Sequence, residues 1–262
     1  MDDCVKRKTQ DVTPTVYRLP STFMYYDQTA YNIRCEWGAP GIAHLAMACD
    51  VVIIVDVLSF STCVDVAVGR GAVVYPFLWG GEELDKFAAK VGGVAASSRR
   101  TDEGRYTLSP ASLRAIPAET RLVLPSPNGA TLSLATGSTP TLAGCLRNAR
   151  SVGQAASKMG QDVLIVPAGE RWSDGTLRPA IEDLIGAGAI ISHMDEGTLS
   201  PEAQIALSAY EMVKDKLYAT LAESSSGREL IERGFGKDVE LASMLDCSDC
   251  APVLRDRSYR SS

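Results

Sequence analysis

The sequence has no apolar run that approaches the ~18 residues of a membrane-spanning helix. Residues 1–20 contain acids and lysines but no apolar stretch of the kind found in a signal peptide. Basic residues are in the minority, since 26 Lys and Arg against 32 Asp and Glu give a net charge of −6. Nucleic-acid-binding proteins usually have a basic surface stripe. We therefore expect a cytoplasmic protein with neither a membrane nor a nucleic acid as its partner.

The motifs of several common enzyme classes are missing as well. There is no GxxxxGK[ST] phosphate-binding loop and no GxSxG nucleophile elbow. Asp56 lacks the second aspartate, two residues later, that a DxDx[TV] phosphatase uses. His44 and His193 are isolated, and the CxxC at 247–250 has no second pair or histidine cluster to complete a zinc site. The seven cysteines are scattered, so we expect free thiols in a reducing compartment.

Short apolar runs rich in β-branched residues alternate with segments of helical periodicity. We predict strands at 51–55, 72–77, 121–125, 142–144 and 162–166, and a further short strand at 252–254. We predict helices at 60–69, 81–90, 145–159, 179–192 and 200–222. Such alternation is typical of βαβ units and predicts an α/β fold with a mainly parallel or mixed sheet.

The domain organisation follows from the same pattern. We expect residues 1–24 to form a flexible N-terminal tail. Residues 25–262 are expected to form one α/β domain with two interlocked lobes, roughly 25–140 and 141–262. The sequence leaves the oligomeric state open, a homo-oligomer included.

Polar residues follow four of the predicted strands at the point where each strand ends. They are Asp56 and Ser59 after the first strand, Asn128 and Gly129 after 121–125, Cys145 and Arg147 after 142–144, and Glu170 and Arg171 after 162–166. In doubly wound sheets, ligands bind beyond the carboxyl ends of the strands. If these strands are parallel neighbours, all four sets share one edge of the sheet, where acids suit a hard cation and arginines suit an oxyanion.

The segment from 167 to 191 contains the densest group of charges. Pro179 fits the first position of a helix, which places Glu182 and Asp183 in its first turn. Adjacent helical residues point about 100° apart, so we expect at most one of these acids to face the site and the other to interact with the helix dipole. Arg178 precedes the same helix start, where an arginine often marks a bound anion.

Structural roles remain as alternatives for several of these residues. Asp56 could simply cap the helix that follows it. Arg147 and Arg178 could be surface arginines near helix starts. Glu170 is harder to explain in this way, because an acid at a strand end is usually solvated.

Six motifs in the chain, in order, resemble those of the ComB family, the 2-phosphosulfolactate phosphatases of coenzyme M biosynthesis. They are DVLSFST at 56–62, SPNGA at 126–130, AGCLRNAR at 143–150, GERW at 169–172, LRPAIEDLIGAGAI at 177–190 and SSGRELIERGF at 225–235. The resemblance runs from EWGAPG at 36–41 to the C-terminus. It implies a three-layer α/β/α fold, Mg²⁺ as cofactor, and hydrolysis of a small anionic phosphoester to phosphate and sulfolactate.

The resemblance also marks site residues. Those at matching motif positions are Asp56, Asn128, Glu170, Asp183, Arg147, Arg171 and Arg178. Our leading hypothesis makes Asp56, Glu170 and Asp183 catalytic, with Asp56 and Glu170 as metal ligands. It assigns substrate binding to Ser59, Asn128, Gly129, Arg147, Arg171 and Arg178. Direct attack by water is favoured over a covalent route through Asp56 or Cys145, because no histidine lies near either in sequence.

One position departs from the family pattern. The pattern associated with the coenzyme M branch of the family reads DVLRA after the first strand, whereas this chain has Ser59 and Phe60 in place of the arginine and alanine. A missing arginine removes one charge-assisted contact to a substrate anion. A different small phosphorylated acid therefore stays open as the substrate, and so do a non-catalytic module that binds an anionic metabolite and a scaffold protein.

Overall fold

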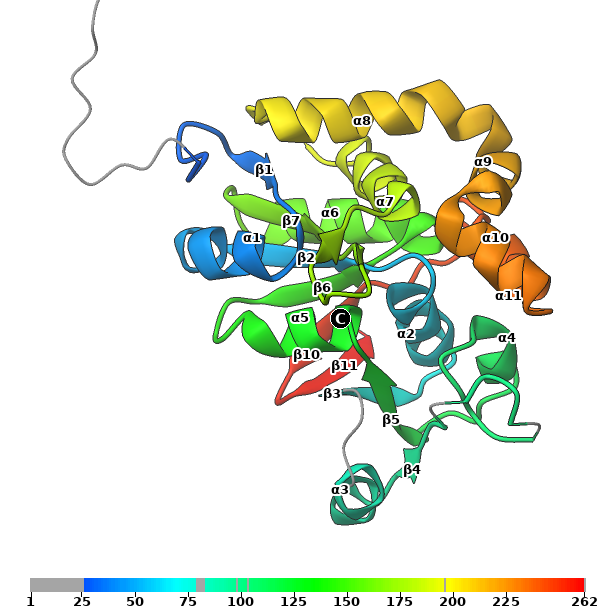
Figure 1. Cartoon of the computed structure of the whole chain (residues 1–262). Coiled ribbons are helices and arrows are strands. Elements are labelled where there is room, and N and C mark those ends of the chain that lie inside the picture. The colour runs from blue at the N-terminus through cyan, green and yellow to red at the C-terminus, as the bar shows by residue number, and fades with distance from the viewer. Residues whose placement is uncertain (1–25, 79–82, 98, 103, 196, 262) are drawn as a thin grey trace, which may run out of the picture.

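The computed structural model describes residues 26–78, 83–97, 99–102, 104–195 and 197–261, and the tail expected at 1–24 lies outside them. A nine-stranded sheet with the order β1-β7-β2-β6-β10-β11-β3-β5-β4 runs through the described chain (Figure 1). Within these residues, no helix is both long and apolar enough to cross a membrane. Helices lie on both sides of the sheet, which confirms the predicted α/β fold.

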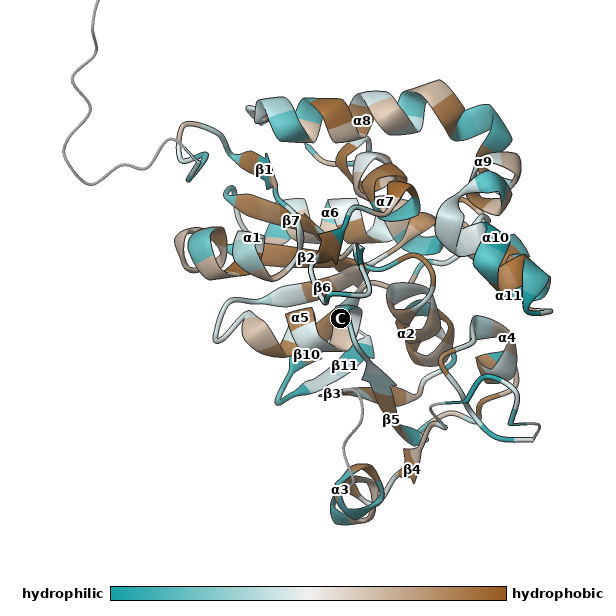
Figure 2. Ribbon diagram, viewed as in Figure 1, coloured by the Kyte–Doolittle hydropathy of each residue, from teal (hydrophilic) through white to brown (hydrophobic). Residues whose placement is uncertain are grey.

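The first half of the sheet is parallel. It consists of β1 (Ile33–Cys35), β7 (Val163–Pro167), β2 (Val51–Val55) and β6 (Thr141–Gly144). Every residue of β2 is buried, and Figure 2 shows β2 and β7 as strongly apolar. A strand covered on both faces loses the alternation of polar and apolar residues, so the VVIIV run was a reliable signal.

Successive residues of β2 face two different helical layers. Val51, Ile53 and Val55 pack toward α6 (Ala149–Met159), α7 (Ile181–Ile191) and α8 (Pro201–Val213). Val52 and Ile54 pack toward α1 (Gly38–Leu45) and α5 (Gly129–Ala135) on the opposite face. The three layers α/β/α are therefore present, with β2 in the middle (Figure 1).

The second half of the sheet runs in the opposite direction. It consists of β3 (Val73–Leu78), β5 (Arg121–Ser126) and β4 (Val94–Ala95), and it joins β6 through the antiparallel hairpin of β10 (Pro252–Arg255) and β11 (Ser258–Ser261). The expectation that 121–125 and 51–55 are parallel neighbours is therefore wrong. Neighbouring strands are rotated by roughly 20°, so roughly 100° of twist accumulates from β2 to β5. This twist brings the end of β5 round toward the end of β2.

Further helices complete the fold. They are α2 (Phe60–Gly69), α3 (Leu84–Val91), α4 (Pro110–Leu113), α9 (Leu217–Glu223), α10 (Ser225–Glu232) and α11 (Gly236–Ala242), with 3-10 turns at Ala46–Ala48, Leu146–Asn148 and Lys214–Lys216. The helix predicted at 200–222 is interrupted by the last of these turns. Residues 81 and 82 of the helix predicted at 81–90 lie outside the described residues.

The helix predicted to start at Pro179 starts two residues later, at Ile181. Arg178 still belongs to a two-stranded ribbon of β8 (Glu170–Arg171) and β9 (Leu177–Arg178). Ala180 is extended, with φ −110° and ψ 116°, and so continues from that ribbon. The pairing of β9 therefore delays the helix.

Candidate active site

Four carboxylates gather where β2 and β7 end. Asp56 directly follows β2, Glu170 starts β8 just after β7, and Glu182 and Asp183 lie in the first turn of α7. Asp56, Glu182 and Asp183 are only 6%, 2% and 3% exposed. Parallel pairing of Val55 with Pro167 sets the two strand ends side by side. We call these four residues the acid cluster.

Asp56 is held by two backbone amides. Its Oδ1 accepts a hydrogen bond from Phe60 N at 3.0 Å, so the residue does cap α2, and its Oδ2 accepts one from Gly129 N at 2.8 Å. A Cβ at position 129 would lie 2.7 Å from Oδ2 and 2.4 Å from the Phe60 ring, so only glycine fits there. Burial raises the pKa of Asp56, while the two amides and then Arg100 oppose that rise.

Gly129 was expected to bind the substrate. In the structure its amide is engaged by Asp56. The turn after β5 therefore fixes the positions of two carboxylates, that of Asp56 through Gly129 and that of Glu170 through Asn128. Asn128 Nδ2 donates a hydrogen bond of 2.8 Å to Glu170 Oε2.

The pKa of Glu170 is displaced from the usual range of a carboxyl group. Burial, followed by the charge of Asp56, raises the pKa of Glu170 from 4.5 to about 7. The hydrogen bond from Asn128 and the charge of Arg178, its partner across β8 and β9, act in the opposite direction. Such a carboxyl group exchanges its proton near neutral pH.

Asp183 ties the two strand ends together. Its Oδ1 accepts a hydrogen bond from Val57 N and its Oδ2 accepts one from Gly169 N, both at 2.8 Å. Burial and then the charges of Asp56 and Glu182 raise the pKa of Asp183 well above its usual range. With both carboxylate oxygens engaged by backbone amides, Asp183 positions the strand ends.

The expectation that only one of Glu182 and Asp183 turns inward is wrong. Both are buried, and the charge of Glu182 also acts on Asp56 and Glu170. The first turn of α7 is enclosed on more than one side, so two directions about 100° apart both lead into the protein interior. The acid cluster thus contains one more buried carboxylate than predicted.

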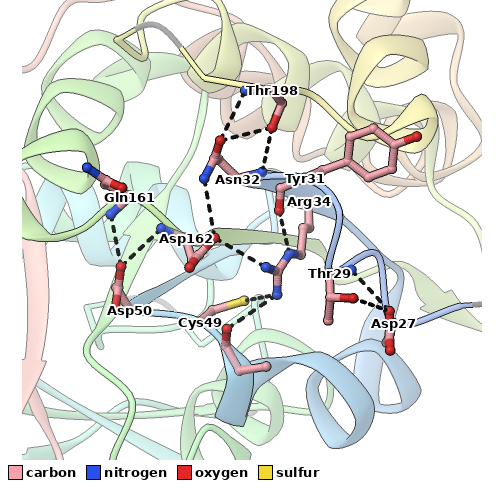
Figure 3. Close-up of polar contacts among 11 residues, drawn as sticks. Asp27, Thr29, Tyr31, Asn32, Arg34, Cys49, Asp50, Gln161, Asp162 and Thr198 are labelled. Atoms are coloured by element: carbon pink, nitrogen blue, oxygen red, sulfur yellow. Dashed lines mark hydrogen bonds and ion pairs between the residues drawn. The ribbon is translucent and has the colours of Figure 1, made fainter. Parts of the chain in front are cut away.

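The acid cluster contrasts with the opposite edge of the sheet. There, Arg34 forms an ion pair of 3.2 Å with Asp162, and Asp50 Oδ2 accepts hydrogen bonds from the amides of Gln161 and Asp162 (Figure 3). By comparison, none of the four acids in the cluster lies within ion-pair distance of a lysine or arginine among the described residues. Buried carboxylates without a cation are costly.

The three predicted arginines go to three different places. Arg178 stays near the acid cluster, where its Nη2 donates to Ser226 Oγ at 3.2 Å and its guanidinium lies 5.9 Å from the centre of the Trp172 ring. Arg171 is exposed and its Nη1 donates to the Gly175 carbonyl.

Arg147 is not brought to the acid cluster. Its Nε forms an ion pair of 2.8 Å with Asp65, whose side chain is fully buried in α2, and its Nη1 donates to the Leu241 carbonyl. Both residues line a separate cavity of about 700 Å³. The interpretation of Arg147 as a surface residue is also wrong, because its side chain is only 14% exposed. The ion pair with the buried Asp65 explains the position of Arg147, and the sequence does not show that these two residues pair.

Cys145 does not have the properties of a nucleophile. It is fully buried, and burial raises its pKa well above the usual range of a thiol. A reactive cysteine needs a lowered pKa and access to the substrate. The structure therefore disfavours the covalent route through Cys145.

Two residues of the site, Arg100 and Asp238, were not predicted from the sequence. Arg100 Nη2 donates a hydrogen bond of 3.1 Å to Ser59 Oγ, and its Nη1 forms an ion pair of 2.8 Å with Asp238 of α11. Arg100 belongs to the polar, irregular stretch after β4, where no periodicity indicates a contact. The only available signal was the pair of arginines at 99–100.

The fold and the site together define a three-layer α/β protein with a buried acidic site at the carboxyl ends of its parallel strands. The model of one family, described as 2-phosphosulpholactate phosphatase, matches residues 41–257. The chain belongs to the 2-phosphosulfolactate phosphatase family, a family of phosphoric monoester hydrolases. The resemblance inferred from the six motifs is confirmed.

Two relatives illustrate the match. The chain is 31% identical over 209 residues to the 2-phosphosulfolactate phosphatase of Methanothermobacter thermautotrophicus, with 78% of this chain and 86% of the relative covered. It is 29% identical over 211 residues to a probable 2-phosphosulfolactate phosphatase of Carboxydothermus hydrogenoformans, with 77% and 84% covered.

Proposed function

We propose that this chain is a cytoplasmic, Mg²⁺-dependent phosphatase that hydrolyses the phosphate ester of a small anionic acid such as 2-phosphosulfolactate, with phosphate and sulfolactate as products. The observation that supports this proposal best is the acid cluster. It concentrates four buried or partly buried carboxylates without an ion-pair partner among the described residues. A bound cation would offset their mutual repulsion.

The donor set fits magnesium better than a metal held entirely by protein. The described residues contain no group of three or more His, Cys, Asp or Glu arranged to hold an ion. Magnesium is usually bound through one or two carboxylates together with waters and substrate phosphate. Asp56 and Glu170, which flank the Asn128–Gly129 turn, would supply these two carboxylates. The cation would neutralise phosphate charge and lower the pKa of a water molecule.

The remaining groups of the site have roles that do not depend on the metal. The amides of Phe60 and Gly129 fix the orientation of Asp56, and Asn128 fixes that of Glu170. Asp183 keeps the ends of β2 and β7 in register. Arg178, held over Trp172, is available to bind an oxyanion of the substrate.

The test is the release of phosphate from a panel of small phosphoesters that includes 2-phosphosulfolactate. We expect turnover of 2-phosphosulfolactate that EDTA abolishes and Mg²⁺ restores. Turnover that EDTA leaves unchanged would contradict the metal role. Binding of the same acids without any release of phosphate would instead support a non-catalytic binding module.

A further inference from the structure

Arg100 occupies a constrained position between two parts of the molecule. One guanidinium nitrogen contacts Ser59, three residues beyond Asp56, and another contacts Asp238. The Arg100 side chain is only 13% exposed. Ser59 is followed by Phe60, whose amide donates the hydrogen bond to Asp56 Oδ1, so the guanidinium lies next to the turn that holds this carboxylate.

The surroundings of Arg100 hold the guanidinium in a fixed place. Asp238 Oδ2 accepts from Arg100, while Asp238 Oδ1 accepts hydrogen bonds from Ser109 Oγ at 2.6 Å and from Ala111 N at 3.2 Å. The ring of Phe235 faces the guanidinium, and the distance from the ring centre to Arg100 Cζ is 5.8 Å. Because Asp238 is itself anchored, Arg100 has little freedom to turn away.

Arg100 retains capacity for a ligand. A guanidinium has five N–H donors in a planar fork that matches the geometry of carboxylates, phosphates and similar oxyanions. The contacts with Ser59 and Asp238 use only part of this set. The guanidinium also forms one wall of a cavity of about 310 Å³, which Arg105, Thr107 and Ser112 line as well. That volume suits part of a small metabolite, and Arg105 adds a second guanidinium to the cavity lining beside the unused donors of Arg100.

We propose that Arg100 and the cavity beside it bind an anionic group of the substrate other than the phosphate that is transferred, namely its sulfonate or carboxylate. The inference rests on the proposed function for the identity of that substrate. Ser59 Oγ accepts a hydrogen bond from Arg100, so a guanidinium from a distant segment is fixed three residues along the chain from Asp56.

The test compares two ligands that separate the anionic groups. Sulfolactate contains the carboxylate and the sulfonate but no phosphate, whereas inorganic phosphate lacks both of them. Isothermal titration calorimetry in Mg²⁺ buffer gives the dissociation constant of each ligand for the full chain and for Arg100→Gln. The matched control is Arg99→Gln, which removes the same charge from the neighbouring, exposed position.

We expect Arg100→Gln to weaken sulfolactate binding roughly ten- to hundredfold, as for the loss of a charge-assisted hydrogen bond. The dissociation constant of inorganic phosphate should change less than roughly threefold, because Arg100 is proposed to contact the sulfonate or carboxylate and not the transferred phosphate. If Arg100→Gln does not fold, Arg100→Lys retains the charge near Asp238 but loses the planar fork. It should then weaken sulfolactate binding in the same direction by a smaller factor.

The outcomes separate this proposal from the proposed function. Sulfolactate binding that depends on Arg100 in a chain that releases no phosphate would support the proposal and contradict the phosphatase assignment. Phosphate release by the chain, with sulfolactate binding unchanged in Arg100→Gln, would support the phosphatase assignment and contradict the proposed role of Arg100. The proposal is also overturned if the full chain does not bind sulfolactate, if both ligands weaken equally, or if Arg99→Gln has the same effect.

Discussion

Replacing Glu170 by glutamine should stabilise the metal-free protein while it abolishes catalysis. The carboxylate of Glu170 lies in the acid cluster, and burial together with the charge of Asp56 raises its pKa from 4.5 to about 7. Glutamine has nearly the same shape, and its side-chain oxygen can accept the hydrogen bond that Asn128 Nδ2 donates at 2.8 Å. The substitution therefore removes the repulsion and retains the contact.

The magnitude follows from the two pKa values of Glu170. The unfolded chain loses this proton near pH 4.5, whereas the folded protein retains it until about pH 7. Because the folded state binds more protons in this interval, the stability of the metal-free protein falls as pH rises from 4.5 through 7. The full shift corresponds to about 3 kcal/mol. About 2 kcal/mol of this loss falls between pH 5.5 and 8.

Urea denaturation in EDTA at pH 5.5 and pH 8 measures this effect. We expect the stability of Glu170→Gln, relative to the unmodified chain, to increase by about 2 kcal/mol between these two pH values. The control is Glu232→Gln, which changes an exposed glutamate of α10 and should show no such pH dependence. A Glu170→Gln variant whose relative stability is the same at both pH values would refute the reasoning.

Three further perturbations follow from the same contacts. Gly129→Ala should lower the free energy of unfolding by more than about 2 kcal/mol and remove most of the activity, because the new Cβ would lie 2.7 Å from Asp56 Oδ2. Urea denaturation and phosphate release measure the two effects. An active variant with the stability of the unmodified chain would contradict this expectation. Arg147→Gln should lower the free energy of unfolding, measured by urea denaturation, by about 3 kcal/mol, because it leaves Asp65 buried without its partner. The KM for the substrate should change by no more than a fewfold. A large rise in KM would indicate that Arg147 does bind the substrate. Magnesium should bind more tightly at pH 8 than at pH 6 in calorimetry, because Glu170 must release its proton first, and affinity independent of pH would argue against Glu170 as a ligand.

Three of the four strands in the parallel half of the sheet, β2, β6 and β7, could be predicted because their signals are local, whereas the three-residue β1 was not predicted. A run such as Val51–Val55 can be recognised from its own residues, because all five are apolar and β-branched. The hairpin of β10 and β11 could not be predicted in full. Its second strand, Ser258–Ser261, is short and polar, and it enters the sheet only because Tyr259 packs into the core against Phe60.

The site divides in the same way. The acids could be identified because each follows a strand or starts a helix, and strand ends converge in α/β folds. The arginines could not be assigned, because an arginine is directed by its partner. Asp65 and Asp238 are buried acids on helices α2 and α11, and nothing in their local sequence shows that they pair with Arg147 and Arg100.

The central claim is that the acid cluster binds the cation needed for hydrolysis of a small phosphoester. The most direct measurement is the initial rate of phosphate release from 2-phosphosulfolactate for the EDTA-treated chain before and after addition of Mg²⁺, with Glu170→Gln in parallel. We predict no release before addition, full activity after it, and no recovery in the variant. Equal rates with and without Mg²⁺, or an active Glu170→Gln variant, would contradict the account.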